Sequence, residues 1–365
     1  MKFSIFRPIL GVASRVLFLG LPLLAIPGQA QTRAYVTNTS GTVSVIDTIK
    51  NTLVATISVG TFPAGVAITP DGTRAYVANI LNSISVIDTA TNAVVDTIPS
   101  GQFPTGLAIT PDGTRVYVVN QFQTNGQNTV SVIDTKTNTI VATIPVGLGP
   151  VAIAITPDGT RAYVPNQQDF NISVIDTATN TVVTDIPVNG AAGVAITPDG
   201  TRAYVTSPGG GTVSVIDIAT NNVVATIFLG GNQNPFGVAI TPDGSRAYVT
   251  INALNLVSVI DTTINTVITT IPVGLGPIGV AITPTGTRGY VANNDSNTVS
   301  VIDIANNAVT ATLGVGAGPN SIAISPGIGP PINKDQCKDG GWRSFTIPRA
   351  FKNQGNCIRF VNTGK

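Results

Sequence analysis

The 365-residue chain contains no histidine and no glutamate, so all 18 of its acidic residues are aspartates. It has two cysteines, one tryptophan and one methionine, and only 10% of its residues are charged. Without histidine there is no Ser-His-Asp triad, no imidazole metal ligand and no side chain that ordinarily titrates near neutrality. Two cysteines are too few for a Cys-rich zinc site. A formal net charge of +1 gives no reason to expect nucleic acid as a partner.

The residues that are abundant favour strands over helices. Glycine occurs 38 times and proline 25 times, and Val, Ile and Thr dominate, whereas Lys, Leu and Met are scarce. β-Branched residues fit pleated sheets, and the scarce residues are the usual helix formers. The composition therefore predicts an all-β protein, a class in which one domain often extends over this length.

Residues 1–30 have the pattern of a signal peptide. Basic residues come first, the apolar run 16–26 follows, and Gly-Gln-Ala at 28–30 has small residues at the −3 and −1 positions of a cleavage site. The alternative is an uncleaved membrane anchor, but a span needs about 20 apolar residues, and Arg15 and Pro22 interrupt any such stretch. We expect a secreted protein, extracellular or at the cell surface, with the periplasm also open, and no transmembrane segment after cleavage.

A single unit occurs seven times along the chain. Each copy begins with a string like Arg-Ala-Tyr-Val, continues with Ser-Val-Ile-Asp and an asparagine four residues later, and closes with a string like Gly-Val-Ala-Ile-Thr-Pro. All the tyrosines of the protein belong to these copies, 41 to 46 residues apart: Tyr35, Tyr76, Tyr117, Tyr163, Tyr204, Tyr248 and Tyr290. A repeat of about 42 residues with four short apolar runs is typical of a propeller blade.

The phase of the repeat predicts how the ring closes. After the signal peptide the chain begins on the second run of a unit, at Arg33, and the repeats end on a copy of the first run, at 320–326. Within each run, apolar residues occupy both the odd and the even positions, which point to opposite faces of a sheet. This pattern favours strands that are covered on both faces. We predict an all-β, seven-bladed β-propeller of four-stranded antiparallel blades over residues 31–326, closed by pairing of the N- and C-terminal strands.

The string Tyr35-Val36-Thr37-Asn38 resembles the YVTN-type β-propeller repeats of secreted and surface proteins in bacteria and archaea. The resemblance covers residues 32–326 and implies the propeller fold and an exported location. Such repeats occur in surface-layer-like proteins, and related propellers occur in lactonases and in quinone- or haem-dependent oxidoreductases. The resemblance therefore does not imply one chemistry.

Arginine and aspartate recur in every unit, and register arithmetic gives them a structural role. Paired residues of an antiparallel hairpin have a constant sum of residue numbers, which places Arg33 opposite Asp47 and Asn38 opposite Thr42. An exposed pair of this kind contributes ~0–1 kcal/mol, and the aspartate can also cap its turn. Groups repeated once per blade lie apart around a ring, so they do not converge on one substrate.

Function is more readily expected on the face where the repeats differ. The turns Thr-Pro-Asp-Gly and Asp-Thr-Ala-Thr-Asn come at one end of the strands, and the variable loops come at the other. Aromatic residues beside amides suit binding of a protein segment or a glycan, although they can instead fill gaps between blades. Five phenylalanines lie in the variable loops: Phe62, Phe103, Phe122, Phe170 and Phe236.

The missing catalytic groups favour binding over catalysis. We predict a non-enzymatic, exported scaffold that presents its variable face to a protein or glycan at the cell surface and uses no cofactor. The alternative is an exported hydrolase or lyase, similar to propeller lactonases, with an oxygen-liganded metal near the central channel. The absence of glutamate weakens that alternative, while calcium held by Asp, Asn and backbone carbonyls stays open.

The end of the chain differs from the repeats. Residues 327–331 read as a Gly/Pro linker, and residues 332–365 form a basic extension with the tryptophan and both cysteines. Export makes a disulfide between Cys337 and Cys357 plausible. The extension is expected to be a cap on the propeller, with contact to an anionic cell-wall polymer as the alternative.

Overall fold

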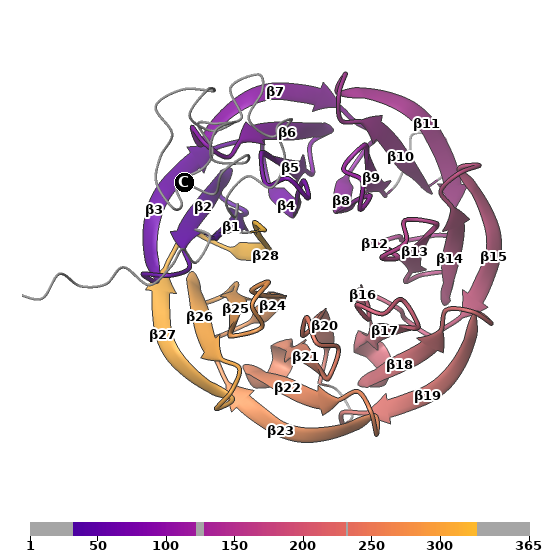
Figure 1. The fold of residues 1–365 in the computed structure, drawn as a ribbon, viewed down its shortest axis with the longest axis vertical. Helices are drawn as coiled ribbons and strands as arrows, with labels where there is room; N and C mark the ends of the chain where they lie inside the picture. Colours follow the sequence, from indigo (N-terminus) through magenta and orange to yellow (C-terminus); the bar gives the residue numbers. More distant parts are fainter. Residues whose placement is uncertain (1–31, 122–127, 231–232, 327–365) are drawn as a thin grey trace, which may run out of the picture.

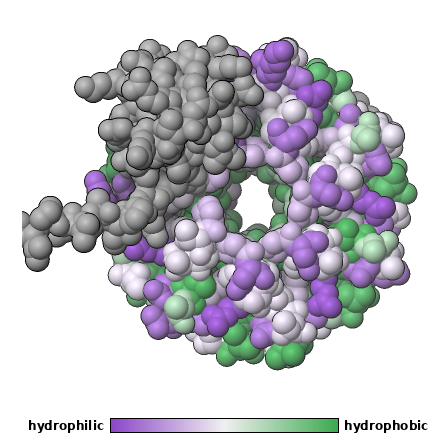
Figure 2. Space-filling view, viewed as in Figure 1, coloured by the Kyte–Doolittle hydropathy of each residue, from purple (hydrophilic) through white to green (hydrophobic). Residues whose placement is uncertain are grey.

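The computed structural model describes residues 32–121, 128–230 and 233–326. Seven four-stranded antiparallel sheets stand around a central channel, each as one blade of a propeller (Figure 1). The space-filling view shows that the channel is open along the axis of the ring (Figure 2). The predicted fold class is therefore confirmed. Among the described residues no helix is long and apolar enough to cross a membrane.

Each blade contributes one strand to each of four concentric positions. The innermost strands are β28 (Pro319–Ile324), β4 (Pro63–Ile68), β8 (Pro104–Ile109), β12 (Ala154–Ile155), β16 (Val194–Ile196), β20 (Pro235–Ile240) and β24 (Pro277–Ile282). The second strands are β1 (Arg33–Asn38), β5 (Arg74–Asn79), β9 (Arg115–Asn120), β13 (Arg161–Asn166), β17 (Arg202–Ser207), β21 (Arg246–Ile251) and β25 (Arg288–Asn293). Blades 1 to 7 are numbered in this order, from the blade of β28 and β1.

The two outer positions complete the blades. The third strands are β2 (Thr42–Asp47), β6 (Ser83–Asp88), β10 (Asn128–Asp134), β14 (Asn171–Asp176), β18 (Thr212–Asp217), β22 (Leu256–Asp261) and β26 (Thr298–Asp303). The outermost strands are β3 (Thr52–Ser58), β7 (Ala93–Pro99), β11 (Thr139–Val146), β15 (Thr181–Pro187), β19 (Asn222–Phe228), β23 (Thr266–Pro272) and β27 (Ala308–Gly314). Two short 3₁₀ helices, η1 (Pro208–Gly210) and η2 (Asn252–Leu254), follow second strands.

Blade 1 is built from both ends of the described chain. Its innermost strand β28 pairs antiparallel with β1, so that Ala34 lies opposite Ile324 and Val36 opposite Ile322. The other three strands of this blade come from the beginning of the repeats. The ring therefore closes within a sheet, as the phase of the repeat predicts.

The hydrophobic core consists of seven clusters, one between each pair of neighbouring blades. Between blades 5 and 6, for example, Tyr204 and Val213 pack with Val249 and Ile260. Second and third strands are thus buried on both faces, which explains why their odd and even positions are both apolar. The outermost strands differ, because they expose many of their Val, Ile and Leu side chains, and hydrophobic residues show at the periphery in Figure 2.

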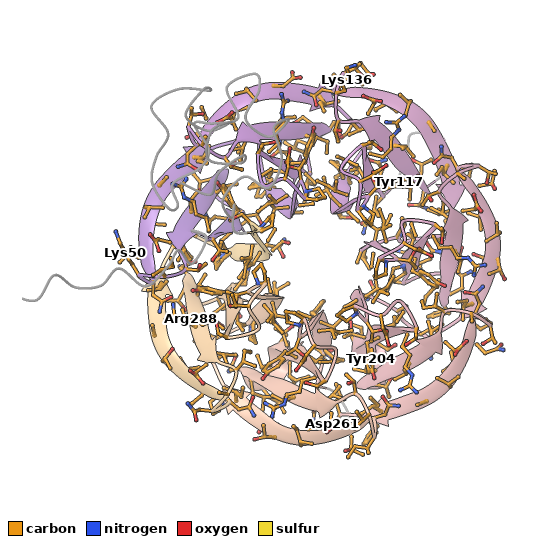
Figure 3. The ribbon with its side chains drawn as sticks, in the orientation of Figure 1. Lys50, Tyr117, Lys136, Tyr204, Asp261 and Arg288 are labelled. Atoms are coloured by element: carbon orange, nitrogen blue, oxygen red, sulfur yellow. The ribbon has the colours of Figure 1, made fainter. Side chains whose placement is uncertain are left out.

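The tyrosines join each blade to the next. Every tyrosine hydroxyl donates to the Oδ1 atom of the repeat asparagine in the following blade, and each of these asparagines has a positive φ. The pairs are Tyr35–Asn92, Tyr76–Asn138, Tyr117–Asn180, Tyr163–Asn221, Tyr204–Asn265, Tyr248–Asn307 and Tyr290–Asn51, at 2.7–3.2 Å. Burial raises the pKa of all seven phenols above their ordinary value. Figure 3 labels Tyr117 and Tyr204 among the blades.

The structural role predicted for the repeated arginine and aspartate is confirmed, with one correction. Arg33 lies opposite Asp47 in the β1–β2 hairpin, and Asp47 caps its turn by accepting from the amides of Ile49 and Lys50, both at 2.9 Å. In the part of the chain that the structure describes, however, only the copy in blade 3 forms an ion pair, Arg115 with Asp134 at 2.7 Å. In most other blades the arginine crosses to the next blade and donates to a turn carbonyl there.

Candidate functional site

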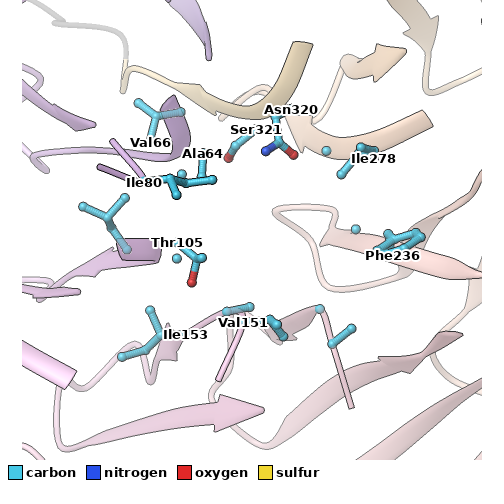
Figure 4. Close-up of a pocket in the computed structure, with 18 of the residues that line it drawn as sticks. Ala64, Val66, Ile80, Thr105, Val151, Ile153, Phe236, Ile278, Asn320 and Ser321 are labelled. Carbon is cyan, nitrogen blue, oxygen red and sulfur yellow. The ribbon is translucent and has the colours of Figure 1, made fainter. Parts of the chain in front are cut away.

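Seven side chains surround the mouth of the central channel on one face (Figure 4). We call this the variable face, because it carries the loops that differ between blades, and the other the constant face. Each innermost segment contributes the residue just before its Gly-Val-Ala-Ile-like string, and this residue varies from blade to blade. These residues, the mouth ring, are Asn320, Ala64, Thr105, Val151, Ala192, Phe236 and Ile278, in order from blade 1 to blade 7.

The backbone of the mouth ring is held by close packing between neighbouring blades. The position after each ring residue is Gly in five blades, Ala in blade 4 and Ser in blade 1. A Cβ atom on Gly193 would lie 2.1 Å from the backbone oxygen of Phe236, and one on Gly65 would lie 2.3 Å from that of Thr105. Small residues are therefore required here, and the ring residues vary on a nearly constant backbone.

The mouth ring borders a cavity of about 380 Å³ to which all seven blades contribute. The larger apolar side chains of the mouth ring, Val151, Phe236 and Ile278, come from blades 4, 6 and 7. Its polar side chains, Asn320 and Thr105, come from blades 1 and 3. Gln167 and Ser321 add further neutral polar groups to the lining. None of the lining residues carries a charge, and the lysines that Figure 3 labels lie at the outer periphery of the ring.

One hydroxyl among the lining residues is buried and unpaired. The Oγ1 atom of Thr105 is buried and has no hydrogen-bond partner among the described residues. A buried hydroxyl without a partner costs about 1–3 kcal/mol, and an acceptor on a ligand would remove that cost only where the neighbouring side chains move to expose the hydroxyl. The other buried polar atoms without a partner all belong to residues that end second strands, outside the cavity lining: Asn79, Asn120, Asn166, Asn293 and Ser207.

The cavity does not provide the ligands that a divalent metal needs. Within residues 32–121, 128–230 and 233–326, no group of three or more His, Cys, Asp or Glu residues could hold a metal ion. The cavity lining offers hydroxyl, amide and backbone oxygens but no carboxylate. Protein sites for hard divalent cations rely on carboxylates, so the oxygen-liganded metal expected for a propeller lactonase does not fit these residues.

Four of the five phenylalanines predicted to bind a partner lie in the part of the chain that the structure describes. Phe62, Phe103 and Phe170 are 51%, 40% and 58% exposed on the variable face, whereas Phe236 lines the cavity. Phe122 lies outside the described residues, as do Cys337 and Cys357. The other six ring residues were not predicted, although one sequence signal marks them: they vary at a single position beside an otherwise uniform string.

Comparison with known proteins supports the fold and bears on the function. No protein-family model and no curated protein matches the chain. A chain of hydrazine synthase from Kuenenia stuttgartiensis is 26% identical, with a TM-score of 0.68, over 74% of this chain and 92% of that one. A functionally unknown protein from Desulfotomaculum acetoxidans is 19% identical, with a TM-score of 0.71, over 80% and 99%. A putative 6-phosphogluconolactonase from Bacteroides uniformis is 17% identical, with a TM-score of 0.69, over 81% and 100%.

These comparisons correct the functional prediction. The two matches below 20% identity show the propeller fold alone, but the hydrazine synthase match, at 26%, extends over most of both chains and comes from an enzyme. The prediction of a non-enzymatic scaffold is therefore wrong; it had taken the missing histidine and other catalytic groups to favour binding over catalysis. The chain is a seven-bladed β-propeller similar to a chain of an enzyme, and the enzymatic alternative is the better reading.

Proposed function

We propose that the protein is an exported hydrolase or lyase that acts on a small, uncharged substrate bound at the mouth of the central channel. The observation that carries this proposal is the unpartnered hydroxyl of Thr105 in a neutral cavity lined by all seven blades. Concave, mostly apolar cavities with a few polar groups are the usual binding sites for small molecules.

The lining selects against charge in the substrate. A phosphate or carboxylate would lose its water without meeting an arginine, lysine or histidine, and burying an unpaired charge is costly. The phosphorylated substrate named for the Bacteroides uniformis protein therefore does not suit this cavity. A neutral ester or lactone suits it better, because its carbonyl oxygen needs only a neutral donor, and the lining contains the amides of Asn320 and Gln167.

The chain's own residues would bind and orient this substrate. Val151, Phe236 and Ile278 would cover its apolar side and exclude water, while the Thr105 hydroxyl would donate to the carbonyl oxygen. Because neighbouring innermost segments pack closely, these donors are preorganised, which favours interaction with an oxygen on which negative charge develops.

The location of the protein is part of the proposal. We propose cleavage of residues 1–30, release to the cell exterior, its surface or the periplasm, and membership of the YVTN-type propeller repeat family. The repeats at 32–326 and the apolar run 16–26 support this. N-terminal sequencing of the protein recovered from culture medium and cell fractions tests it.

Replacing the Thr105 hydroxyl tests the proposed site. The protein is assayed against a panel of uncharged lactones and esters, and Thr105→Val is compared with Thr61→Val. Thr61 is exposed on the variable face and does not line the cavity. We expect Thr105→Val to lower kcat/KM about two- to tenfold, since a lost hydrogen bond costs roughly 0.5–1.5 kcal/mol. Equal activity of the two variants, or no turnover of any substrate in the panel, would refute the proposal.

A further inference from the structure

Two backbone positions of the variable face have a left-handed conformation in every copy that the structure describes. One lies two residues before each mouth-ring residue, and the other lies in the hairpin between second and third strands. The first position is Phe62, Phe103, Gly149, Gly190, Asn234, Gly276 and Gly318, with φ between 48° and 66°. The second, in the six blades where it is described, is Gly41, Asn82, Phe170, Gly211, Asn255 and Asn297, with φ between 55° and 88°.

At three of these left-handed positions the residue is a phenylalanine, which does not favour a positive φ. Gly adopts a positive φ without cost and Asn tolerates it, whereas for a bulky residue it is an outlier that costs roughly 1–2 kcal/mol. All the other described copies are Gly or Asn, so the left-handed backbone at these two positions does not call for a phenylalanine. Phe62, Phe103 and Phe170 are 51%, 40% and 58% exposed, so they do not belong to the buried core.

The three phenylalanines belong to neighbouring blades. Phe62 precedes β4 of blade 2, Phe103 precedes β8 of blade 3, and Phe170 ends the hairpin of blade 4 (Figure 1). Leu81 and Leu148, which are also exposed, lie in the variable-face loops of the same three blades. We call these five residues the aromatic arc.

The aromatic arc is continuous with the cavity. The carbonyl of Phe62 accepts at 3.1 Å from the amide of Ile80, which lines the cavity. Phe103 lies two residues before Thr105, whose hydroxyl has no partner. At the other end of the arc Gln167, also in the lining, is three residues from Phe170. A ligand lying along the arc would thus reach the side of the mouth that carries the free hydroxyl.

The loops of the arc are almost free of charge. Residues 59–62, 80–82, 100–103, 147–149 and 167–170 contain one charged side chain, Asp169, and its Oδ2 atom already accepts from the amide of Leu148 at 2.7 Å. The other polar groups are neutral amides and hydroxyls, such as Gln102 and Gln168. This composition offers no attraction to an anionic or a cationic polymer.

We propose that the aromatic arc binds an extended, uncharged oligosaccharide, and that an ester or lactone group carried at one end of this chain occupies the cavity. Sugar rings have apolar C–H faces that stack on aromatic rings, and their hydroxyls pair with amides. Rings distributed over three blades suit an extended chain of repeating units, whereas a protein epitope is usually held by a compact, desolvated cluster of anchors. This inference names the substrate class for the proposed function and rests on it.

The arc is tested by giving it the residues that other blades use. The triple variant Phe62→Gly, Phe103→Gly, Phe170→Asn keeps the left-handed backbone and removes the three rings. Binding of cellohexaose, xylohexaose, mannohexaose and laminarihexaose to the full chain is measured by calorimetry. We expect at least tenfold weaker binding of the preferred hexasaccharide, with a Tm equal to or above that of the wild type because strain is relieved. Leu254→Ala, an exposed hairpin residue of blade 6, should change Kd less than twofold.

Several outcomes would overturn the inference. These are wild-type binding by the triple variant, no binding of any of the four hexasaccharides, and binding of uncharged peptides in their place. A fall in Tm of several degrees would instead identify the rings as structural fillers. The proposed function can fail independently of this inference. Turnover of small lactones without hexasaccharide binding would reject only oligosaccharide binding by the arc. Hexasaccharide binding with no turnover in any assay would reject the proposed hydrolase or lyase activity.

Discussion

The tyrosine hydroxyls provide a measurable link between blades. In Tyr204→Phe the buried ring stays, so no cavity forms, and only the hydroxyl is lost. That hydroxyl donates to Asn265 Oδ1 at 2.7 Å and lies 3.2 Å from the carbonyl oxygen of Thr262. A typical intramolecular hydrogen bond contributes about 0.5–1.5 kcal/mol net. Asn265 is partly exposed, so water can replace the lost donor, and we expect a loss of about 1 kcal/mol.

The assay is urea denaturation followed by far-UV circular dichroism, with thermal unfolding as a second measurement. For a protein of this size, about 1 kcal/mol corresponds to a decrease in Tm of roughly 2 °C. The informative control is Tyr290→Phe, which removes the hydrogen bond from blade 7 to Asn51 of blade 1, also at 2.7 Å. If the ring is closed, the two substitutions lower the free energy of unfolding equally. A loss for Tyr204→Phe with none for Tyr290→Phe would refute closure as described.

Two further predictions concern the same ring. A chain ending at residue 318 lacks β28 and leaves β1 paired only with β2, so its Tm should fall by roughly 10 °C or more, whereas a chain ending at 326 should melt like the full protein. Equal Tm values for the two truncations would contradict the closure. Because burial raises the pKa of the seven phenols, their contribution to stability is complete below about pH 10, the pKa of an unfolded tyrosine, and is lost as the pH rises from there through the higher pKa of the folded state. In a titration followed at 295 nm, phenolate should appear together with unfolding, and ionisation of the folded protein near pH 10 would argue against buried hydroxyls.

Some contacts follow from the sequence because they lie within one hairpin. Arg33 and Asp47 were paired correctly, since the residue numbers of an antiparallel hairpin fix its register. The hydrogen-bond partner of Arg33 was not predicted, because its side chain reaches the carbonyl of Thr89 in the next blade. Thr48 and Thr89 occupy equivalent places in the repeat, and only the arrangement of the blades decides which of them is close.

The candidate site shows the same limit. Thr105 and Val151 stand next to apolar strings, and a pattern based on alternation treats them as ordinary strand residues. Their convergence depends on the ring, which brings together residues about 40 positions apart. For Phe62 the loop was predicted correctly, but its positive φ and exposed ring depend on the hairpin and blade around it.

The pairing of β28 with β1 also affects how the chain assembles. Every other blade is made of consecutive segments, whereas these two strands come from opposite ends of the repeats. The repeats are so similar that β28 of one molecule presents the same hydrogen-bonding edge to the β1 strand of another. Closing a long loop costs entropy that an intermolecular contact at high concentration avoids. Refolding from concentrated solution should therefore yield strand-exchanged dimers and longer chains of propellers, in which each molecule completes the first blade of its neighbour.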